Sequence, residues 1–184
     1  MNTRIESLQL IESACWRELE RAAREREHPW RVMALATVDS TGEGAEARSI
    51  VVREVRAGAR ELMFYADDRS GKVAQIGQHP RGTLLGWSAT LGWQLRLRVH
   101  VQRCDDGLDT SSRWARLKLS PGAHDYLSPM APGTPLDAPT HESGSRPYFT
   151  VLCARVESMD WLELHAEGHR RAQFDARGAR WLQP

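Results

Sequence analysis

Strict alternation of apolar and polar residues in one segment, WQLRLRVHVQR at residues 93–103, constrains the fold more than any other feature of the sequence. Successive side chains of a β-strand point to opposite faces, so such a segment buries one face and turns the other toward water or a ligand. The apolar set is Leu95, Leu97, Val99 and Val101, and the polar set is Gln94, Arg96, Arg98, His100 and Gln102. The segment therefore predicts a half-buried strand.

Further segments of strand-like composition are separated by turns that contain glycine and aspartate. They cover residues 31–38, 46–55, 61–65, 82–87, 148–164 and 170–176. Apolar residues at three- and four-residue spacing predict a helix over 6–26 and a second helix over 110–126. Short antiparallel strands with few helices predict a mainly β fold of the α+β class, as a barrel or a sandwich.

The length of the chain fits one domain over residues 1–184. Its N-terminal helix region covers residues 1–28, and a loop rich in proline and glycine covers residues 129–147. Loops of that length are usually lids or disordered segments.

The charge of the chain is nearly balanced, with 25 Lys and Arg against 24 Asp and Glu. A general nucleic-acid-binding protein is usually strongly basic, so no nucleic-acid partner is expected. A weak alternative is nucleic-acid binding through the polar strand face that carries Arg96, Arg98, His100 and Arg103. No apolar run approaches the roughly 20 residues that span a bilayer, so a soluble cytoplasmic protein without a membrane partner is expected.

The three cysteines, Cys15, Cys104 and Cys153, are widely spaced and form no CxxC pair. This pattern suggests neither a disulfide framework nor a zinc site, and it favours a reducing cytoplasm.

Two short motifs are interpreted as structural. GEGAEA at residues 42–47 has dinucleotide-binding spacing, but it lies between two strand patterns and predicts a hairpin turn. HAEGH at residues 165–169 lacks the glutamate that a zinc helix needs directly after its first histidine, so no metal is expected. No G-x-S-x-G segment supports a hydrolase.

Lys72 lies in the first turn of a helical pattern that follows DDRS at residues 67–70. A helix start already carries partial positive charge, so a lysine there is unexpected. One interpretation is a solvated lysine behind a turn in which Asp67, Asp68 or Ser70 caps the helix. The other is an anion site, because free amide groups plus a cation bind phosphate.

Several segments, taken together in their order along the chain, favour the anion site at Lys72. They are ARSIVVRE with Arg48 and Arg53, FYADDRSGK with Tyr65 and Lys72, HPR at residues 79–81, LGWQLRLRV with Gln94, and a C-terminal pattern of Trp161, His169, Arg171 and ARWLQP. In these segments, over residues 30–103 and 148–184, the chain resembles the pyridoxamine 5'-phosphate oxidase-like family of FMN-binding split barrels.

That resemblance implies a six-stranded antiparallel split β-barrel with flanking helices, and a homodimer with FMN at the subunit interface. Lys72 and Arg48 would hold the FMN phosphate, with Ser70 beside them. The backbone of Ser49, Ile50, Val51 and Val52 would pass along the isoalloxazine edge. The remaining FMN contacts implied by the resemblance are Arg53, Tyr65, Ala66, Gln94, Trp161 and Arg171.

The chain departs from the family pattern at both the FMN-binding positions and the substrate-binding positions. Arg53 stands where the family has a lysine, Ala66 where it has a threonine and Gly71 where it has an arginine. Arg69 is available to take the place of that missing arginine. At the family's substrate-phosphate positions the chain has Trp114, Lys118, Gly122 and Glu167. These residues predict poor activity on pyridoxamine 5'-phosphate. Arg53, Lys118 and His169 are the candidates for contact with a different small substrate.

The leading hypothesis is a flavoenzyme in which FMN accepts or donates a hydride at N5. The alternative is a non-catalytic flavin- or tetrapyrrole-binding module on the same fold. A homodimer is also predicted because the apolar faces of Ile50, Val52, Leu95 and Leu97 exceed what one short helix can cover.

Overall fold

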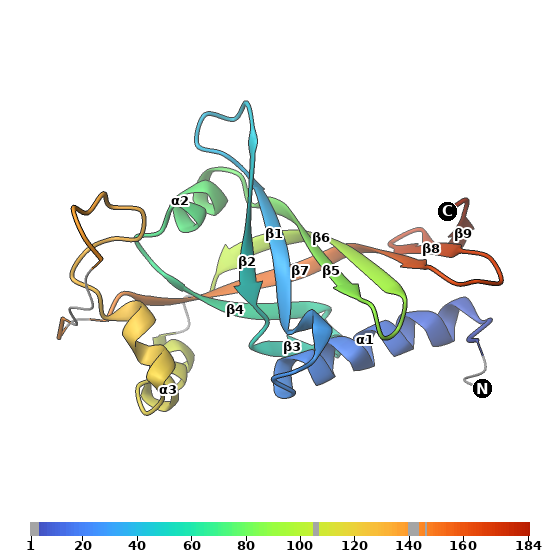
Figure 1. Ribbon diagram of the computed structural model, residues 1–184, viewed down its shortest axis with the longest axis horizontal. Helices are drawn as coiled ribbons and strands as arrows, with labels where there is room; N and C mark the ends of the chain where they lie inside the picture. Colours follow the sequence, from blue (N-terminus) through green and yellow to red (C-terminus); the bar gives the residue numbers. More distant parts are fainter. Residues whose placement is uncertain (1–3, 105–106, 140–143, 146) are drawn as a thin grey trace.

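Alternating segments of the chain pair into one antiparallel sheet (Figure 1). The structure, a computed structural model, describes residues 4–104, 107–139, 144–145 and 147–184. Within these residues nine strands pair in the order β2-β1-β5-β6-β7-β4-β3, with β8 pairing with β7 and β9 with β8. The strands are β1 (Val32–Val38), β2 (Ala45–Val51), β3 (Glu54–Arg56), β4 (Glu61–Asp67), β5 (Arg81–Ser88), β6 (Trp93–Arg103), β7 (Phe149–Glu163), β8 (Arg170–Asp175) and β9 (Gly178–Leu182).

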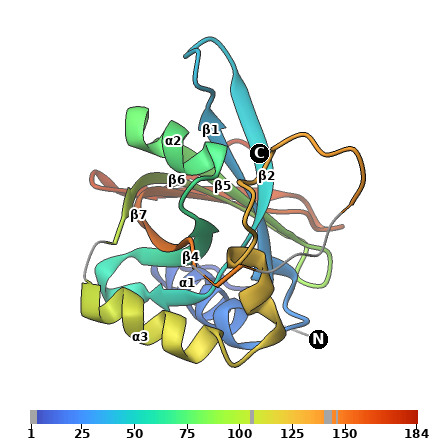
Figure 2. The ribbon, with the colours of Figure 1, turned by 90° about the vertical axis from the view of Figure 1, so that its left-hand side faces the viewer.

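Three α-helices flank the sheet in the described part of the chain (Figure 2). They are α1 (Leu8–Arg24), α2 (Gly71–Gln78) and α3 (Gly107–Leu117), and the short 3-10 turns are η1 (Pro29–Arg31), η2 (Ala57–Ala59) and η3 (Pro121–Tyr126). The predicted mainly β split-barrel fold is confirmed, although the sheet does not close. Short β3 and the β8–β9 hairpin extend the six strands that the resemblance implies.

The core lies between α1 and the inner face of the sheet. Ile11, Cys15 and Leu19 of α1 are fully buried there. The rings of Trp93 and Trp161 meet edge to face, with centroids 5.4 Å apart. Burying each large apolar side chain contributes roughly 1.5–3 kcal/mol, so this layer stabilises the packing of α1 against the sheet.

The predicted alternation of residues 93–103 is confirmed by the burial of β6. Leu95, Leu97, Val99 and Val101 are fully buried. Ile50 and Val52 are also buried in the chain's own core, so the argument that these apolar faces remain uncovered is wrong. The face left open is the opposite one.

The segment GEGAEA forms the predicted hairpin turn between β1 and β2. Asp39 accepts hydrogen bonds from the backbone of Thr41 and Gly42, both at 2.9 Å. Gly42 has φ +79°, a left-handed conformation that glycine adopts without a steric penalty.

The predicted helix over 110–126 is wrong at its C-terminal end. α3 stops at Leu117, and residues 121–126 form the 3-10 turn η3 instead. Pro121 lacks an amide hydrogen and cannot continue an α-helical ladder. The loop over 129–147 contains no helix or strand in its described residues.

The cysteine spacing suggested no disulfide framework, but the structure contains one disulfide. Cys104 and Cys153 form a disulfide, with Cα atoms 5.9 Å apart, while Cys15 is free and buried. The pairing of β6 with β7 brings together residues 49 apart in the sequence. Cysteine spacing alone does not reveal such a pair, and it no longer supports a reducing compartment.

None of the described helices is long and apolar enough to span a membrane.

Candidate functional site

Arg48 lies on edge strand β2 with its side chain on the inner face, opposite Leu35 of β1. Its guanidinium donates to Gln75 Oε1 of α2 at 2.9 Å and to the Thr37 hydroxyl. An ion pair at 2.9 Å also joins the Arg48 guanidinium to the exposed carboxylate of Glu46. These bonds hold the cation at the junction of β1, β2 and α2.

Lys72 stands beside Arg48 at the start of α2. No hydrogen bond or ion pair joins its ammonium group to the described residues. Burial lowers the pKa of Lys72 from its ordinary value, and the positive charge of Arg48 lowers it further, while Asp67 opposes the change. A half-buried cation beside another cation is a place where a bound anion is favoured.

The first turn of α2 has no side-chain cap. Ser70 is the N-cap residue, but its hydroxyl donates to the backbone carbonyl of Asp67 at 2.7 Å instead of accepting from the helix. The interpretation that Asp67, Asp68 or Ser70 caps this helix is therefore wrong. Amide groups at a helix start that lack a cap need another acceptor, such as an anion or water.

Arg69 is occupied by contacts within the chain. It pairs with Asp67 at 2.7 Å and donates to the backbone carbonyls of Ser128 and Pro129 at 2.9 and 3.1 Å. Its guanidinium lies 3.3 Å from the ring centroid of Tyr148. Arg69 thus fastens the start of the proline-rich loop next to α2.

A cluster of charged and aromatic residues lies around Arg53, just after the C-terminal end of β2. Arg53 lies 5.5 Å from the ring centroid of Tyr65. The Tyr65 hydroxyl donates to Glu54 at 3.2 Å, and Arg113 of α3 pairs with the same carboxylate at 2.7 Å. Burial raises the pKa of Tyr65 to about 12, with a further contribution from Glu54. The phenol therefore remains a neutral donor at physiological pH.

The outer face of the sheet carries a second polar group. Asp160 of β7 pairs with Arg96 of β6 and with Arg171 of β8, at 2.5 and 2.9 Å. Burial tends to raise the pKa of Asp160, but the two arginines outweigh it and the net pKa is lowered. Gln94 shares this face, because it is two residues before Arg96 in the strand.

The FMN contacts implied by the resemblance are not all brought together in one chain. Arg48 and Lys72 lie together, whereas Gln94 and Arg171 lie on the outer sheet face. Trp161 is fully buried on the inner face, and its indole Nε1 has no hydrogen-bond partner among the described residues. Ala66 is also buried.

Of the residues at substrate positions, Trp114 packs against Phe149 and Tyr126, with ring centroids 5.5 and 6.5 Å apart. Lys118 is exposed. His169 lies in the turn before β8, where its Nδ1 accepts from the backbone of His165 at 3.2 Å. These side chains do not form a convergent cationic group.

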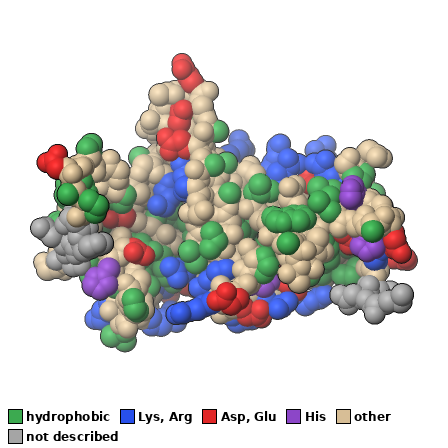
Figure 3. Space-filling view, in the orientation of Figure 1, with side chains coloured by type: hydrophobic (Ala, Val, Ile, Leu, Met, Phe, Trp, Pro, Cys, Tyr) green, Lys and Arg blue, Asp and Glu red, His purple; other side chains and the backbone are tan. Residues whose placement is uncertain are grey.

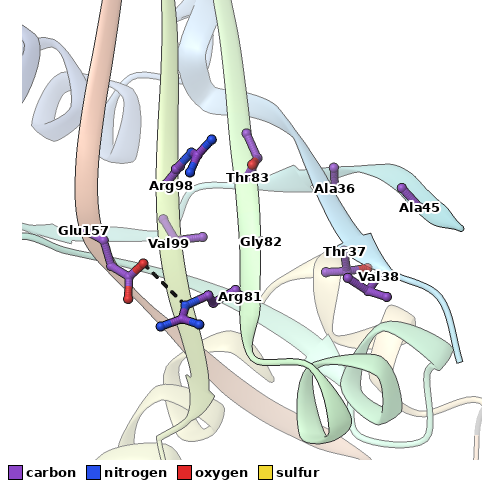
Figure 4. A pocket seen from close by; sticks show the side chains of 10 residues that line it. All are labelled: Ala36, Thr37, Val38, Ala45, Arg81, Gly82, Thr83, Arg98, Val99 and Glu157. Carbon is purple, nitrogen blue, oxygen red and sulfur yellow. Dashed lines mark ion pairs between the residues drawn. The ribbon is translucent and has the colours of Figure 1, made fainter. Parts of the chain in front are cut away.

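A hollow of about 510 Å³ opens over β1, β5 and β6 (Figure 4). Its lining residues are Ala36, Thr37, Val38, Ala45, Arg81, Gly82, Thr83, Arg98, Val99 and Glu157. Arg81 and Glu157 face each other at 3.8 Å across one side. The hollow shares Thr37 with the Arg48 contacts but includes neither Arg48 nor Lys72.

The sequence profile of one family, described as pyridoxamine 5'-phosphate oxidase, FMN-binding domain, matches residues 13–104, half of the chain. The chain belongs to this family. The matched region contains Arg48, Lys72 and Gln94, and it ends before Trp161 and Arg171. No curated protein sequence shows significant similarity.

Solved structures share the fold of this pyridoxamine 5'-phosphate oxidase family member. A pyridoxamine 5'-phosphate oxidase-related, FMN-binding protein from Nostoc punctiforme has a TM-score of 0.73 at 24% identity, covering 94% of this chain and 96% of its own. PhzG from Burkholderia lata, in complex with tetrahydrophenazine-1-carboxylic acid, has a TM-score of 0.76 at 16% identity, with 100% and 99% coverage. A heme-binding protein from Mycobacterium smegmatis has a TM-score of 0.51 at 17% identity, covering 84% of this chain and 57% of its own. These likenesses show the fold alone.

Sequence reasoning missed the residues that support Arg48 in this family member. Thr37 and Gln75 are both buried polar residues, and a 2.7 Å hydrogen bond joins them. Gln75 lies between Val73 and Ile76 on the buried side of α2. A polar residue on an apolar helix face was the available signal, because buried polar groups need partners.

Proposed function

We propose that the chain binds FMN and acts as an oxidoreductase on a small substrate. The observation that carries the proposal is the half-buried Lys72 ammonium beside Arg48, at a helix start without a side-chain cap. A phosphate dianion supplies the negative charge and the acceptor oxygens that Lys72 and the uncapped amides of α2 lack. When bound, FMN would supply hydride chemistry, and the protein would position it.

Edge strand β2 fits the proposed position of the isoalloxazine ring. Within the described sheet, β2 pairs with β1 alone. An edge strand presents unpaired backbone donors and acceptors. The backbone groups of Ser49 to Val51 that point away from β1 are therefore available to a planar ring that carries both donors and acceptors, whereas the Val52 amide donates to the Arg31 carbonyl at 2.9 Å.

A homodimer completes the proposed site. Gln94 and Arg171 lie on an outer sheet face that the chain leaves open, and the same face exposes Val32, Leu85 and Trp87, by 49%, 41% and 46%. Figure 3 shows hydrophobic side chains gathered over β5 on the surface seen in Figure 1. Exposed apolar patches often mark interfaces, and two-fold dimers are the commonest oligomers. In such a dimer each subunit would offer this face to the FMN of its partner.

The residues at the substrate-binding positions of the family do not resemble a phosphate-binding pocket. Trp114 is packed among aromatic rings, Lys118 is exposed and Glu167 is 76% exposed in its side chain. A substrate phosphate needs paired cations or convergent donors. We therefore propose a less anionic small molecule as the substrate, with Arg53 and His169 as contact candidates.

The test is identification of the bound flavin. Protein purified under native conditions is expected to be yellow and to release FMN, recognised by mass, when it is denatured. Bound flavin that is reduced by a nicotinamide and reoxidised by an acceptor would support an oxidoreductase. A colourless protein that does not bind added FMN contradicts the proposal, and a Soret band from bound tetrapyrrole would instead support a binding module.

A further inference from the structure

The disulfide between Cys104 and Cys153 lies beneath α3 and takes no part in the proposed flavin contacts. Its Cα separation of 5.9 Å is within the range of about 4.4–6.8 Å that disulfides adopt. Cys153 packs with Met63 and Val151, and the cluster includes Cys104, Tyr65 and Phe149.

The surroundings of the two sulfurs differ in ways that matter for reactivity. Cys104 directly follows β6 and is half-buried, which makes it the more exposed of the two cysteines and the expected point of attack by an external thiolate. Cys153 is only 8% exposed, and it lines a small cleft of about 30 Å³ together with Glu61, His100, Gln102 and Arg155.

The lining of the cleft places Arg155 and His100 beside Cys153. A thiolate is stabilised by neighbouring cations, and a stabilised thiolate is a better leaving group in disulfide exchange. Arg155 supplies a permanent positive charge, and His100 adds one when protonated. Glu61 opposes them, but its carboxylate lies 3.9 Å from Arg56, which offsets its charge.

We propose that Cys104 and Cys153 form a reversible thiol–disulfide site for small thiols. A thiolate attacks the sulfur of Cys104, and the electron pair of the broken bond leaves on Cys153. A second thiol then attacks the mixed disulfide and releases the reduced Cys104. In total, two small thiols become one small disulfide, and the protein disulfide gains two electrons and two protons to become two thiols.

Reduction is expected to loosen α3 on the sheet. Thr110 of α3 donates its hydroxyl hydrogen to the Cys104 carbonyl at 3.0 Å, and Arg113 contacts the sulfur of Met63 at 3.5 Å, in the cluster that holds Cys153. Whether the disulfide is oxidised or reduced is therefore expected to affect how tightly α3 packs against the cluster that contains Met63 and Tyr65. Loss of a disulfide typically costs a few kcal/mol, which lowers the Tm of a chain of this size by about 5–15 °C.

The experiment is alkylation of the native protein, followed by peptide mass analysis, before and after treatment with reduced glutathione. We expect Cys104 and Cys153 to be protected before treatment, labelled after it, and protected again after incubation with oxidised glutathione. Cys15 is the internal control, because it is fully buried and should be labelled only on denaturation. Labelling of Cys104 and Cys153 in protein treated with oxidised glutathione, or a bond that resists reduced glutathione in the folded protein, would overturn the proposal.

A charge variant tests the role assigned to the cleft. Arg155→Gln should slow reduction by glutathione several-fold, because the leaving thiolate loses its cation. Arg116→Gln is the matched control, since Arg116 is exposed on α3 and does not line the cleft. Equal rates in the two variants would remove Arg155 from the proposal.

Discussion

Lys72 shows how one residue can contradict a local rule and thereby indicate a ligand. A lysine in the first turn of a helix opposes the helix dipole, and burial adds a further cost to its charge. The charge of Asp67 offsets only part of these costs, and no described residue forms a hydrogen bond or an ion pair with Lys72. A phosphate bound there would offset both.

The lowered pKa of Lys72 predicts the pH dependence of FMN binding. A lysine with a lowered pKa loses its proton at a lower pH than free lysine, whose pKa is about 10.4. FMN affinity should therefore be highest between the second pKa of the phosphate, about 6, and the Lys72 pKa, and it should fall as the pH rises through the Lys72 pKa. Fluorescence titration at stepped pH measures this fall.

Lys72→Arg is the matched variant for this prediction, because arginine stays charged throughout the range. Its FMN affinity should decline less at alkaline pH than that of the wild type. Identical pH profiles for the two proteins would show that Lys72 does not contact the phosphate.

Residues that carry charge could be identified from the sequence, whereas their supports could not. Arg48 and Lys72 stand in motifs with recognisable spacing. Gln75 and Thr37 support Arg48 from two other elements, and only the folded chain brings them to one point. Pairwise contacts of this kind leave no local pattern.

At the scale of elements, Arg69 connects the loop before α2 with the start of the proline-rich loop. Arg69→Ala removes the pair with Asp67 and the bonds to the carbonyls of Ser128 and Pro129. We expect faster proteolytic cleavage within residues 129–139 and a smaller loss of FMN affinity than Lys72→Ala causes. An FMN loss as large as that of Lys72→Ala, with unchanged cleavage, would make Arg69 a phosphate ligand instead.

The protein is expected to turn over pyridoxamine 5'-phosphate poorly, because the residues of α3 are not arranged to bind a substrate phosphate. Its Trp114 packs into an aromatic cluster, and Arg113 is taken up by Glu54. Steady-state oxidation by the FMN-loaded protein should give a kcat/KM well below the ordinary range of about 10⁴ M⁻¹s⁻¹ or more. A value within that range would show that the substrate side has been misinterpreted.

Element types could be predicted better than element ends or partners. Alternation in β6 identified a half-buried strand, because period-two burial is a local property. The end of α3 at Leu117 and the bridge between Cys104 and Cys153 depended on Pro121 and on strand register. Register is a property of the assembled sheet, so the sequence did not reveal it.

For the whole molecule, the open outer face predicts a dimer in solution. Leu85→Glu places a charge among the exposed apolar residues Val32, Leu85 and Trp87 of β1 and β5, and charges are disfavoured at interface cores. Light scattering should give twice the chain mass for the wild type and a shift toward monomer for this variant. Leu108→Glu is the control, because Leu108 is 91% exposed on α3. A wild-type protein that stays monomeric with FMN bound would contradict the dimer.

The phosphate anchor is tested most directly by comparing FMN with riboflavin, which lacks the phosphate, in fluorescence titrations. Loss of one charge-assisted contact typically costs about 1.5–3 kcal/mol, a ten- to hundredfold change in affinity. We expect FMN to bind the wild type at least tenfold more tightly than riboflavin, and Lys72→Ala and Arg48→Ala to narrow that preference, with Lys118→Ala as the exposed-lysine control. Equal affinities of the wild type for FMN and riboflavin, or an unchanged preference in both variants, would contradict a phosphate site at the start of α2.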